Sequence, residues 1–375
     1  MLVLWPRSPA TKVRGRCVRN LVSRLGPVST YSLSQLTALV LASMVAGGAA
    51  AADFVRPEKA GDPLRWGMVG GLQIGLWQAS RRDGPRGLIR LFYPVDGPQQ
   101  AASLVNFIAV EPVVEGRKGY SELERSPGDG QQGLRMAAIQ QPLMATTRDP
   151  APPSAGELGT LTDQPGVSTL SVPIAVEPFA NGAHVGLVAT FRSDRPGEVQ
   201  FAVHAEQDSA RLEYATLSAT MGNYARLRRL WLRTRVVDSK VVYADYQGTD
   251  FTSDVYFPRD DLLVTREGDV LVAATPDEAH PAAVRPFAGR SNWWWHGGVF
   301  TQYWRKPAGA SKPDLHVRVN GRRTYWGFGQ LIPGGVSFEN SELRERYYPG
   351  QVFVWGITPE TPLALGFPNF DAPPP

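Results

Sequence analysis

Three glutamates in this sequence have surroundings suited to acid–base chemistry. Glu111 follows an apolar run and precedes Pro112, where a carboxylate can be held rigidly at the edge of a pocket. Glu339 and Glu342 lie in the stretch 334–348, with glycines before them and polar residues around them. Cleavage of a glycosidic bond by hydrolysis uses two carboxyls, one as acid and one as base or nucleophile. We therefore expect these glutamates to be the catalytic residues of a glycoside hydrolase.

The stretch 106–130, which contains Glu111, is dense in charges of both signs. Arg117 lies in it and is a candidate for binding the polar groups of a substrate. The interpretation as the wall of a cleft competes with a simpler one. A mixed-charge loop that follows a strand is often a solvated rim with no chemical role. The sequence leaves both interpretations open.

The C-terminal third is rich in tryptophan, and its densest part is NWWWHGGVFTQYW, residues 292–304. If Trp293, Trp294 and Trp295 form a strand, successive rings point to opposite faces, so they do not all enter one core. An exposed aromatic plane can stack against the apolar face of a sugar ring, since it offers apolar area beside polar groups. We expect these tryptophans, with Trp304 and Arg305, to bind substrate. The alternative is an aromatic core with a cap over a sheet edge.

A second reaction fits a different set of side chains. In a polysaccharide lyase, a tyrosine or histidine removes the proton next to a uronate carboxyl, and cationic groups neutralise the growing negative charge. His204, His296 and Tyr303 are the candidates for this role. Histidines on polar strand faces are also commonly just solvated. Hydrolysis is slightly favoured over elimination.

Several other chemistries have no motif to support them. The sequence lacks G-x-S-x-G, H-E-x-x-H, a phosphate-binding G-x-x-x-x-G-K and a dinucleotide fingerprint. We expect no cofactor and no transition-metal site. The loop 245–254 contains Asp245, Asp250 and Asp254, but it lacks the regular spacing of a calcium loop, so Ca²⁺ is only weakly indicated there.

The first 52 residues have the composition of a secretory signal peptide. They carry six basic residues, no acidic ones, and a short apolar stretch that ends in small residues. Removing six of the 39 basic residues leaves 33 against 35 acidic ones, a net charge of −2. The basic character thus belongs to the leader, which argues against nucleic-acid binding. We expect export to the periplasm or outside the cell, with no stable membrane anchor after cleavage.

The rest of the chain, 53–375, is expected to be one β-sandwich domain. Glycines and prolines, 38 and 32 in the full sequence, separate short apolar runs, and the only cysteine, Cys17, lies in the leader. Strands are expected at 71–79, 86–95, 198–206 and 351–358, and the stretch 315–329 is expected to form a hairpin that turns at Asn320-Gly321. Residues 221–235 suit a helix or a strand equally.

The fold class that follows is all-β: a large sandwich, either one twisted sandwich or two packed lobes, with few helices. A lobe boundary is expected in the Pro/Gly-rich loop 146–166. The pentapeptide IAVEP occurs at 108–112 and again at 174–178, by coincidence or because two halves are duplicated.

The combined expectation is an exported carbohydrate-active enzyme that cleaves a polysaccharide in an aromatic-lined cleft. Its partner is a polysaccharide or oligosaccharide. The alternative is a carbohydrate-binding or cell-envelope protein that uses the same aromatic surface without catalysis.

Overall fold

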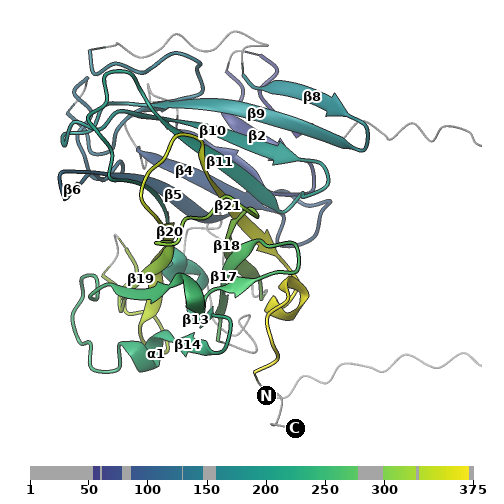
Figure 1. The fold of residues 1–375 in the computed structure, drawn as a ribbon, viewed down its shortest axis with the longest axis vertical. Helices are drawn as coiled ribbons and strands as arrows, with labels where there is room; N and C mark the ends of the chain where they lie inside the picture. Colours follow the sequence, from purple (N-terminus) through teal and green to yellow (C-terminus); the bar gives the residue numbers. More distant parts are fainter. Residues whose placement is uncertain are drawn as a thin grey trace, which may run out of the picture. The chain divides into compact units, whose positions relative to one another are not determined.

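The structure is a computed structural model. It describes residues 54–59, 61–77, 86–128, 130–146, 158–277, 299–326 and 329–370. Over these residues the regular structure is almost entirely β, arranged as two large antiparallel sheets that pack as sandwich-like lobes (Figure 1). The expected all-β sandwich with few helices is therefore confirmed. The leader 1–52 and its expected role lie outside the described residues.

The first sheet runs, in spatial order, through β1 (Phe54–Val55), β2 (Arg65–Met68), β3 (Gln73–Gly75), β4 (Leu88–Tyr93), β5 (Ser103–Val114), β12 (Tyr214–Thr220), β20 (Ser337–Arg344), β19 (His316–Arg322) and β15 (Val255–Pro258). The short β6 (Arg117–Lys118) pairs with the end of β5.

The second sheet runs through β14 (Val236–Asp238), β13 (Leu227–Trp231), β17 (Val270–Pro276), β18 (Thr301–Lys306), β21 (Gln351–Thr358), β11 (Glu198–Ala205), β10 (Val185–Arg192), β9 (Val167–Val176) and β7 (Met136–Ala137). At its margins, β16 (Leu263–Val264) pairs with β17 and β8 (Thr160–Gln164) pairs with β9.

Helical structure among the described residues is confined to single turns. These are η1 (Gly222–Ala225), α1 (Ser239–Val242), η2 (Arg259–Asp261) and η4 (Pro362–Leu365). None of the described helices is long and apolar enough to cross a membrane.

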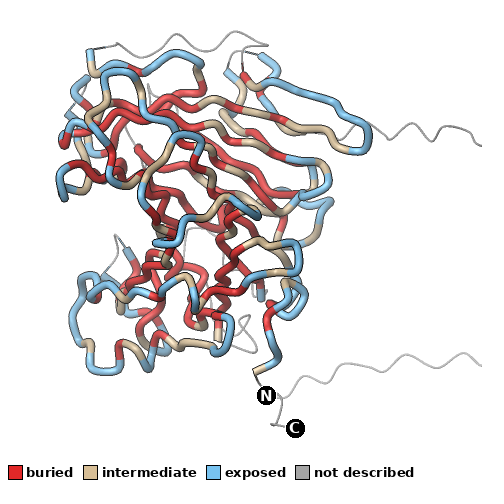
Figure 2. The backbone as a smooth tube through the Cα atoms, in the orientation of Figure 1, coloured by how far each residue is buried: buried red, intermediate tan, exposed pale blue. Residues whose placement is uncertain are grey.

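Both sheets bury their inner faces in one shared hydrophobic core. Because side chains alternate along a strand, Val110 of β5 and Leu217 of β12 point inward to this core, and Glu111 and Thr216 point to the outer face. Figure 2 shows the buried residues concentrated in the strands. Each fully buried aliphatic side chain contributes about 1.5–3 kcal/mol relative to exposure, so this core stabilises a domain that has no disulfide.

The strand expectations hold best where alternation is clean. The expected strand 351–358 is β21, and 198–206 corresponds to β11, with Val199, Phe201 and Val203 fully buried. The expected turn at Asn320-Gly321 is wrong, because both residues lie inside β19 at a register shift opposite β20. A Cβ on Gly321 would lie 2.8 Å from Ser337 O, so the register shift requires a residue without a side chain there.

The ambiguous stretch 221–235 divides into two elements. Met221 and Arg226 have positive φ angles at the ends of the turn η1, and the chain then enters β13. The apolar residues at helical spacing, Leu227 and Leu230, pack into the shared core as strand residues.

The repeated IAVEP segments lie in different sheets. The first is inside β5, which continues through Pro112 to Val114, so Glu111 lies within the strand. Pro112 is tolerated there because β4 ends its pairing with β5 at Ala109. The second segment ends β9, with Glu177 just beyond it. Of the expected lobe boundary at 146–166, residues 147–157 lie outside the described residues.

Candidate functional site

Ser121 ties the loop after β6 to the outer face of the first sheet. Its backbone N–H donates to Val110 O (3.1 Å), its hydroxyl donates to Gly87 O (2.5 Å) and accepts from the N–H of Val110 (2.9 Å). Gly87 has φ +69°, and a Cβ there would meet Ser121 O at 1.9 Å, so only glycine fits. This anchoring places Glu122 beside Glu111.

We use the name acid group for Glu111, Glu122 and Glu342 with the two cations among them, Lys118 and Arg318. Lys118 forms an ion pair with Glu111. Arg318 Nε lies 2.8 Å from Glu342 Oε1, and its Nη2 lies 3.8 Å from Glu111 Oε2. The side chains of Glu111 and Glu342 are 4% and 0% exposed, so the charges act on each other with little screening by water.

The acid group has more carboxyls than cations. Asp254 adds a further acid on Arg318, since its Oδ2 accepts from Nη1 at 3.0 Å. Burial first, then the charge of Glu342, raises the pKa of Glu111. The surrounding carboxyls outweigh burial at Lys118 and hold its pKa above the ordinary value. The group therefore retains a proton more readily than separate glutamates would.

Glu122 is the one glutamate of the acid group that is partly exposed. Its Oε2 is nevertheless buried and has no hydrogen-bond partner among the described residues. Burial, followed by the charge of Glu111, raises the pKa of Glu122 to about 8. A carboxyl that stays protonated near pH 7 can act as a general acid.

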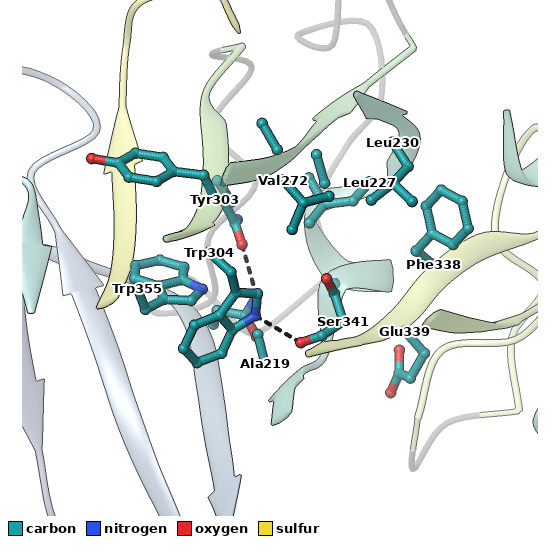
Figure 3. A pocket seen from close by; sticks show the side chains of 15 residues that line it. Ala219, Leu227, Leu230, Val272, Tyr303, Trp304, Phe338, Glu339, Ser341 and Trp355 are labelled. Carbon is teal, nitrogen blue, oxygen red and sulfur yellow. Dashed lines mark hydrogen bonds between the residues drawn. The ribbon is translucent and has the colours of Figure 1, made fainter. Parts of the chain in front are cut away.

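Glu339, the third predicted catalytic glutamate, is separate from the acid group. It occupies the register shift in β20 and is among the residues that line a cavity of about 20 Å³ between the sheets (Figure 3). Burial raises its pKa to about 8, and neither carboxyl oxygen has a hydrogen-bond partner among the described residues. The cavity has room for about one water molecule and not for a sugar. The structure thus pairs Glu111 with Glu342 but not with Glu339.

Tyr303 and Arg305 do meet, on the outer face of the second sheet. Both donate to Glu198 Oε1, at 3.0 Å and 3.1 Å, and Arg305 also binds Asp269. Burial and Glu198 raise the pKa of Tyr303, which makes its deprotonation harder. His204, exposed at the far end of β11, contacts Glu206 and does not join them. The described part of the predicted lyase site is therefore not assembled.

The described tryptophans of the C-terminal third divide between core and surface. Trp304 is 2% exposed, and its indole donates to Ser341 O at 2.8 Å (Figure 3). Trp304 and Trp355 are core residues, which corrects the expectation that Trp304 binds substrate. Trp326 is 40% exposed. Trp293, Trp294, Trp295 and His296 lie outside the described residues, so the predicted platform stays a prediction.

The remaining predicted residues are surface groups. Arg117 faces Glu115 at 3.8 Å across the β5–β6 turn, and both side chains are well exposed. Asp254 accepts hydrogen bonds from Arg318 and Asn320, and Asp250 accepts one from the N–H of Phe251. Asp245 is exposed as well. In the parts of the chain that are described, no group of three or more His, Cys, Asp or Glu residues could hold a metal ion.

A larger hollow, which the sequence analysis missed, lies over β2, β3 and β4. It measures about 330 Å³, and its lining includes Arg65, Arg90, Trp77 and Phe92. The spacing of Arg90 and Phe92, two residues apart, indicates that they share one face of β4. Their convergence with Arg65 depends on strand register, for which the sequence carries no signal.

The acid group can hold and exchange a proton beside a partly exposed surface, which is what acid–base catalysis requires. No known family model matches the sequence, and no curated protein matches it either.

Proposed function

We propose that this chain is an exported carbohydrate-active enzyme that hydrolyses a polysaccharide, with the acid group as its acid–base centre. The proposal depends mainly on one observation: Glu111, Glu122 and Glu342 converge on one sheet face, and among the described residues the cations that pair with them are Lys118 and Arg318. Export is proposed from the leader composition alone.

In the proposed reaction Glu122 is the general acid. It donates its proton to the glycosidic oxygen as the bond to the anomeric carbon breaks, and water supplies the hydroxyl that replaces the leaving sugar. Glu111, held next to Lys118, is the carboxylate that receives the proton from the attacking water. Arg318 binds both Glu111 and Glu342 and positions them.

The test is the mass of products after the purified protein is incubated with neutral and uronate-containing polysaccharides. Hydrolysis yields fragments that carry one added water. We expect Glu122→Gln to lower turnover by about 10²- to 10⁴-fold, the usual contribution of a general acid. Folding should be preserved, since a neutral amide replaces a carboxyl that is largely protonated near pH 7.

Glu124 provides the matched control, two residues further along the same loop. Its carboxylate accepts backbone N–H groups of Tyr120 and Ala180 and does not belong to the acid group. Glu124→Gln should keep turnover within about threefold of the wild type, well below the general-acid effect. Fragments lighter by one water would contradict hydrolysis and indicate a lyase.

A glycan-binding protein without catalysis is the second candidate. The observation in its favour is that Glu111 and Glu342 are buried, whereas the hollow of about 330 Å³ is open. Retention on one polysaccharide with no fragments, for wild type and Glu122→Gln alike, would replace the enzyme proposal with this one.

A further inference from the structure

The hollow over β2, β3 and β4 is built around one cross-strand row. Arg65 of β2 pairs with Gly75 of β3, and Gly75 pairs with Arg90 of β4. The two arginines are thus two strands apart, roughly 10 Å between Cα atoms. Because Gly75 has no side chain, the space between two cations stays open instead of being filled.

Aromatic rings hold the two guanidinium groups in place. Arg65 Cζ lies 3.8 Å from the centroid of the Phe92 ring, and Arg90 Cζ lies 4.7 Å from the centroid of the Trp77 ring. Arg90 Nη2 also donates to Leu76 O at 2.5 Å. Stacking of this kind pre-organises a planar guanidinium, so less conformational entropy is lost when it binds a planar anion.

Arg65 is partly desolvated, and no acid among the described residues forms an ion pair with it. Its Nη2 donates to Ala102 O at 3.1 Å, and its Nε is buried without a partner among the described residues. No ion pair of Arg65 occurs within the described chain, and burial alone lowers its pKa. The nearby Asp62 is turned into its own loop, where it accepts the N–H groups of Glu58 and Lys59. A charge removed from water without a counterion favours binding of an anion.

We propose that this hollow binds a carboxylate-bearing sugar, with Arg65 as the main anchor of the carboxylate and the Trp77–Phe92 side as the contact for the sugar ring. A guanidinium fork matches a carboxylate with two parallel hydrogen bonds. The remaining lining, Pro63, Leu64 and Leu76, is apolar and suits the C–H face of a ring. The sugar part of this inference depends on the proposed function, whereas the anion part stands on the hollow itself.

Calorimetric titration of the full chain with digalacturonate, cellobiose and inorganic phosphate tests the inference without any turnover. We expect digalacturonate to bind, more weakly as NaCl is raised, and cellobiose and phosphate to bind at least tenfold more weakly. Arg65→Gln should weaken digalacturonate binding at least tenfold, and Arg65→Lys should restore part of it. Phosphate binding as tightly as digalacturonate would overturn the sugar part and keep the anion part.

Two further variants test whether a loss of binding comes from the loss of the Arg65 charge or from misfolding. A Cβ on Gly75 would lie 2.9 Å from Phe92 Cε2, so Gly75→Ala should push that ring into the hollow and weaken binding while both cations remain. Arg266→Gln, an exposed arginine beyond β16, is the control and should bind as the wild type. If Arg65→Gln, folded, binds digalacturonate as tightly as the wild type, the inference is wrong. Glu122→Gln should bind normally, which separates this outcome from a failure of the proposed hydrolysis.

Discussion

Glu111 and Glu177 occupy the same place in the two IAVEP segments, yet their surroundings differ. Glu177 is fully buried and fully paired: Arg135 donates from Nε (2.9 Å), Nη2 (2.6 Å) and its backbone N–H (2.9 Å), and Ser126 adds a hydroxyl (3.1 Å). Glu111 shares its cations Lys118 and Arg318 with Glu342, and Glu122 lies close enough to repel it.

The difference separates a structural carboxylate from one suited to chemistry. At Glu177 both carboxyl oxygens accept hydrogen bonds, and the guanidinium of Arg135 lies against the carboxylate. At Glu111 the carboxyls outnumber the cations, and the group lowers its energy by keeping a proton. Burial alone does not distinguish the two glutamates, because both are buried; the balance of charge around them does.

The largest effect on stability is expected from breaking the ion pair between Glu177 and Arg135. Glu177→Ala removes the ion pair with the guanidinium of Arg135, which is 3% exposed, and this should lower the free energy of unfolding by about 3–5 kcal/mol. Urea unfolding near pH 7 measures it. The double variant Glu177→Leu with Arg135→Met should lose less than the single one, since no charge stays buried alone. A loss below about 1 kcal/mol for Glu177→Ala would show that the pair is not structural.

Glu339 extends the comparison to a buried carboxyl that forms no ion pair among the described residues, although the charge of Arg322 opposes the effect of burial on its pKa. Its pKa, raised to about 8, exceeds the ordinary value of 4.5, so the folded state holds a proton that the unfolded state releases. Its contribution to stability is therefore complete below pH 4.5 and is lost as pH rises toward 8. Glu339→Gln removes this dependence. At about 1.4 kcal/mol per pKa unit, reduced for water penetration, the variant should gain about 2–3 kcal/mol over the wild type between pH 5 and 8.

The measurement for Glu339 is the urea midpoint of both proteins at pH 5, 6, 7 and 8. The gap between them should widen with pH, because only the wild type has a carboxyl to ionise at this position. A constant gap would mean that Glu339 ionises normally in the folded state.

Lys118→Gln should lower the free energy of unfolding by about 1–2 kcal/mol near pH 7, which is less than the loss expected from breaking the ion pair between Glu177 and Arg135. When Lys118 loses its charge, Glu111 takes up a proton instead of remaining an unpaired buried anion. Because the pKa of Glu111 is already raised, the cost should be small at pH 5 and grow as pH rises through that pKa. Urea midpoints from pH 5 to 8 measure this trend. A loss that is equal at all pH values would mean that Glu111 takes up no proton when Lys118 loses its charge.

How far the sequence predicts this molecule depends on the kind of contact. Alternation in β11 identifies a strand, because the period of two is local and one face must be buried. The sequence also predicts β21, as a short apolar run that is buried along most of its length. The sequence also nominates Glu111 and Glu342, but their meeting requires β5, β12, β20 and β19 to lie side by side in one sheet. No local pattern encodes that order.

The errors have the same physical origin. Asn320-Gly321 resembles a hairpin turn, yet it lies within β19, where pairing with β20 and the hydrogen bond from the N–H of Thr252 to Gly321 O override turn propensity. Trp304 is an aromatic residue of the kind that can bind a sugar at a surface, but it fills the space between the two sheets. Only tertiary packing determines that position. The row Arg65–Gly75–Arg90 joins residues up to 25 positions apart through register alone.

The smallest effect is expected at Arg117, one residue before Lys118 in β6. Its ion pair with Glu115 is 3.8 Å long, with side chains 65% and 83% exposed, so Arg117→Ala should change the free energy of unfolding by no more than about 0.5 kcal/mol. Urea unfolding compared with Lys118→Gln checks this directly. The two substitutions would then differ in their effect on the free energy of unfolding only because the Lys118 side chain lies in the acid group and the Arg117 side chain lies in water. If Arg117→Ala instead weakened binding of a polysaccharide tenfold at unchanged stability, the rim of the acid group would be the binding surface that the sequence predicts for this residue.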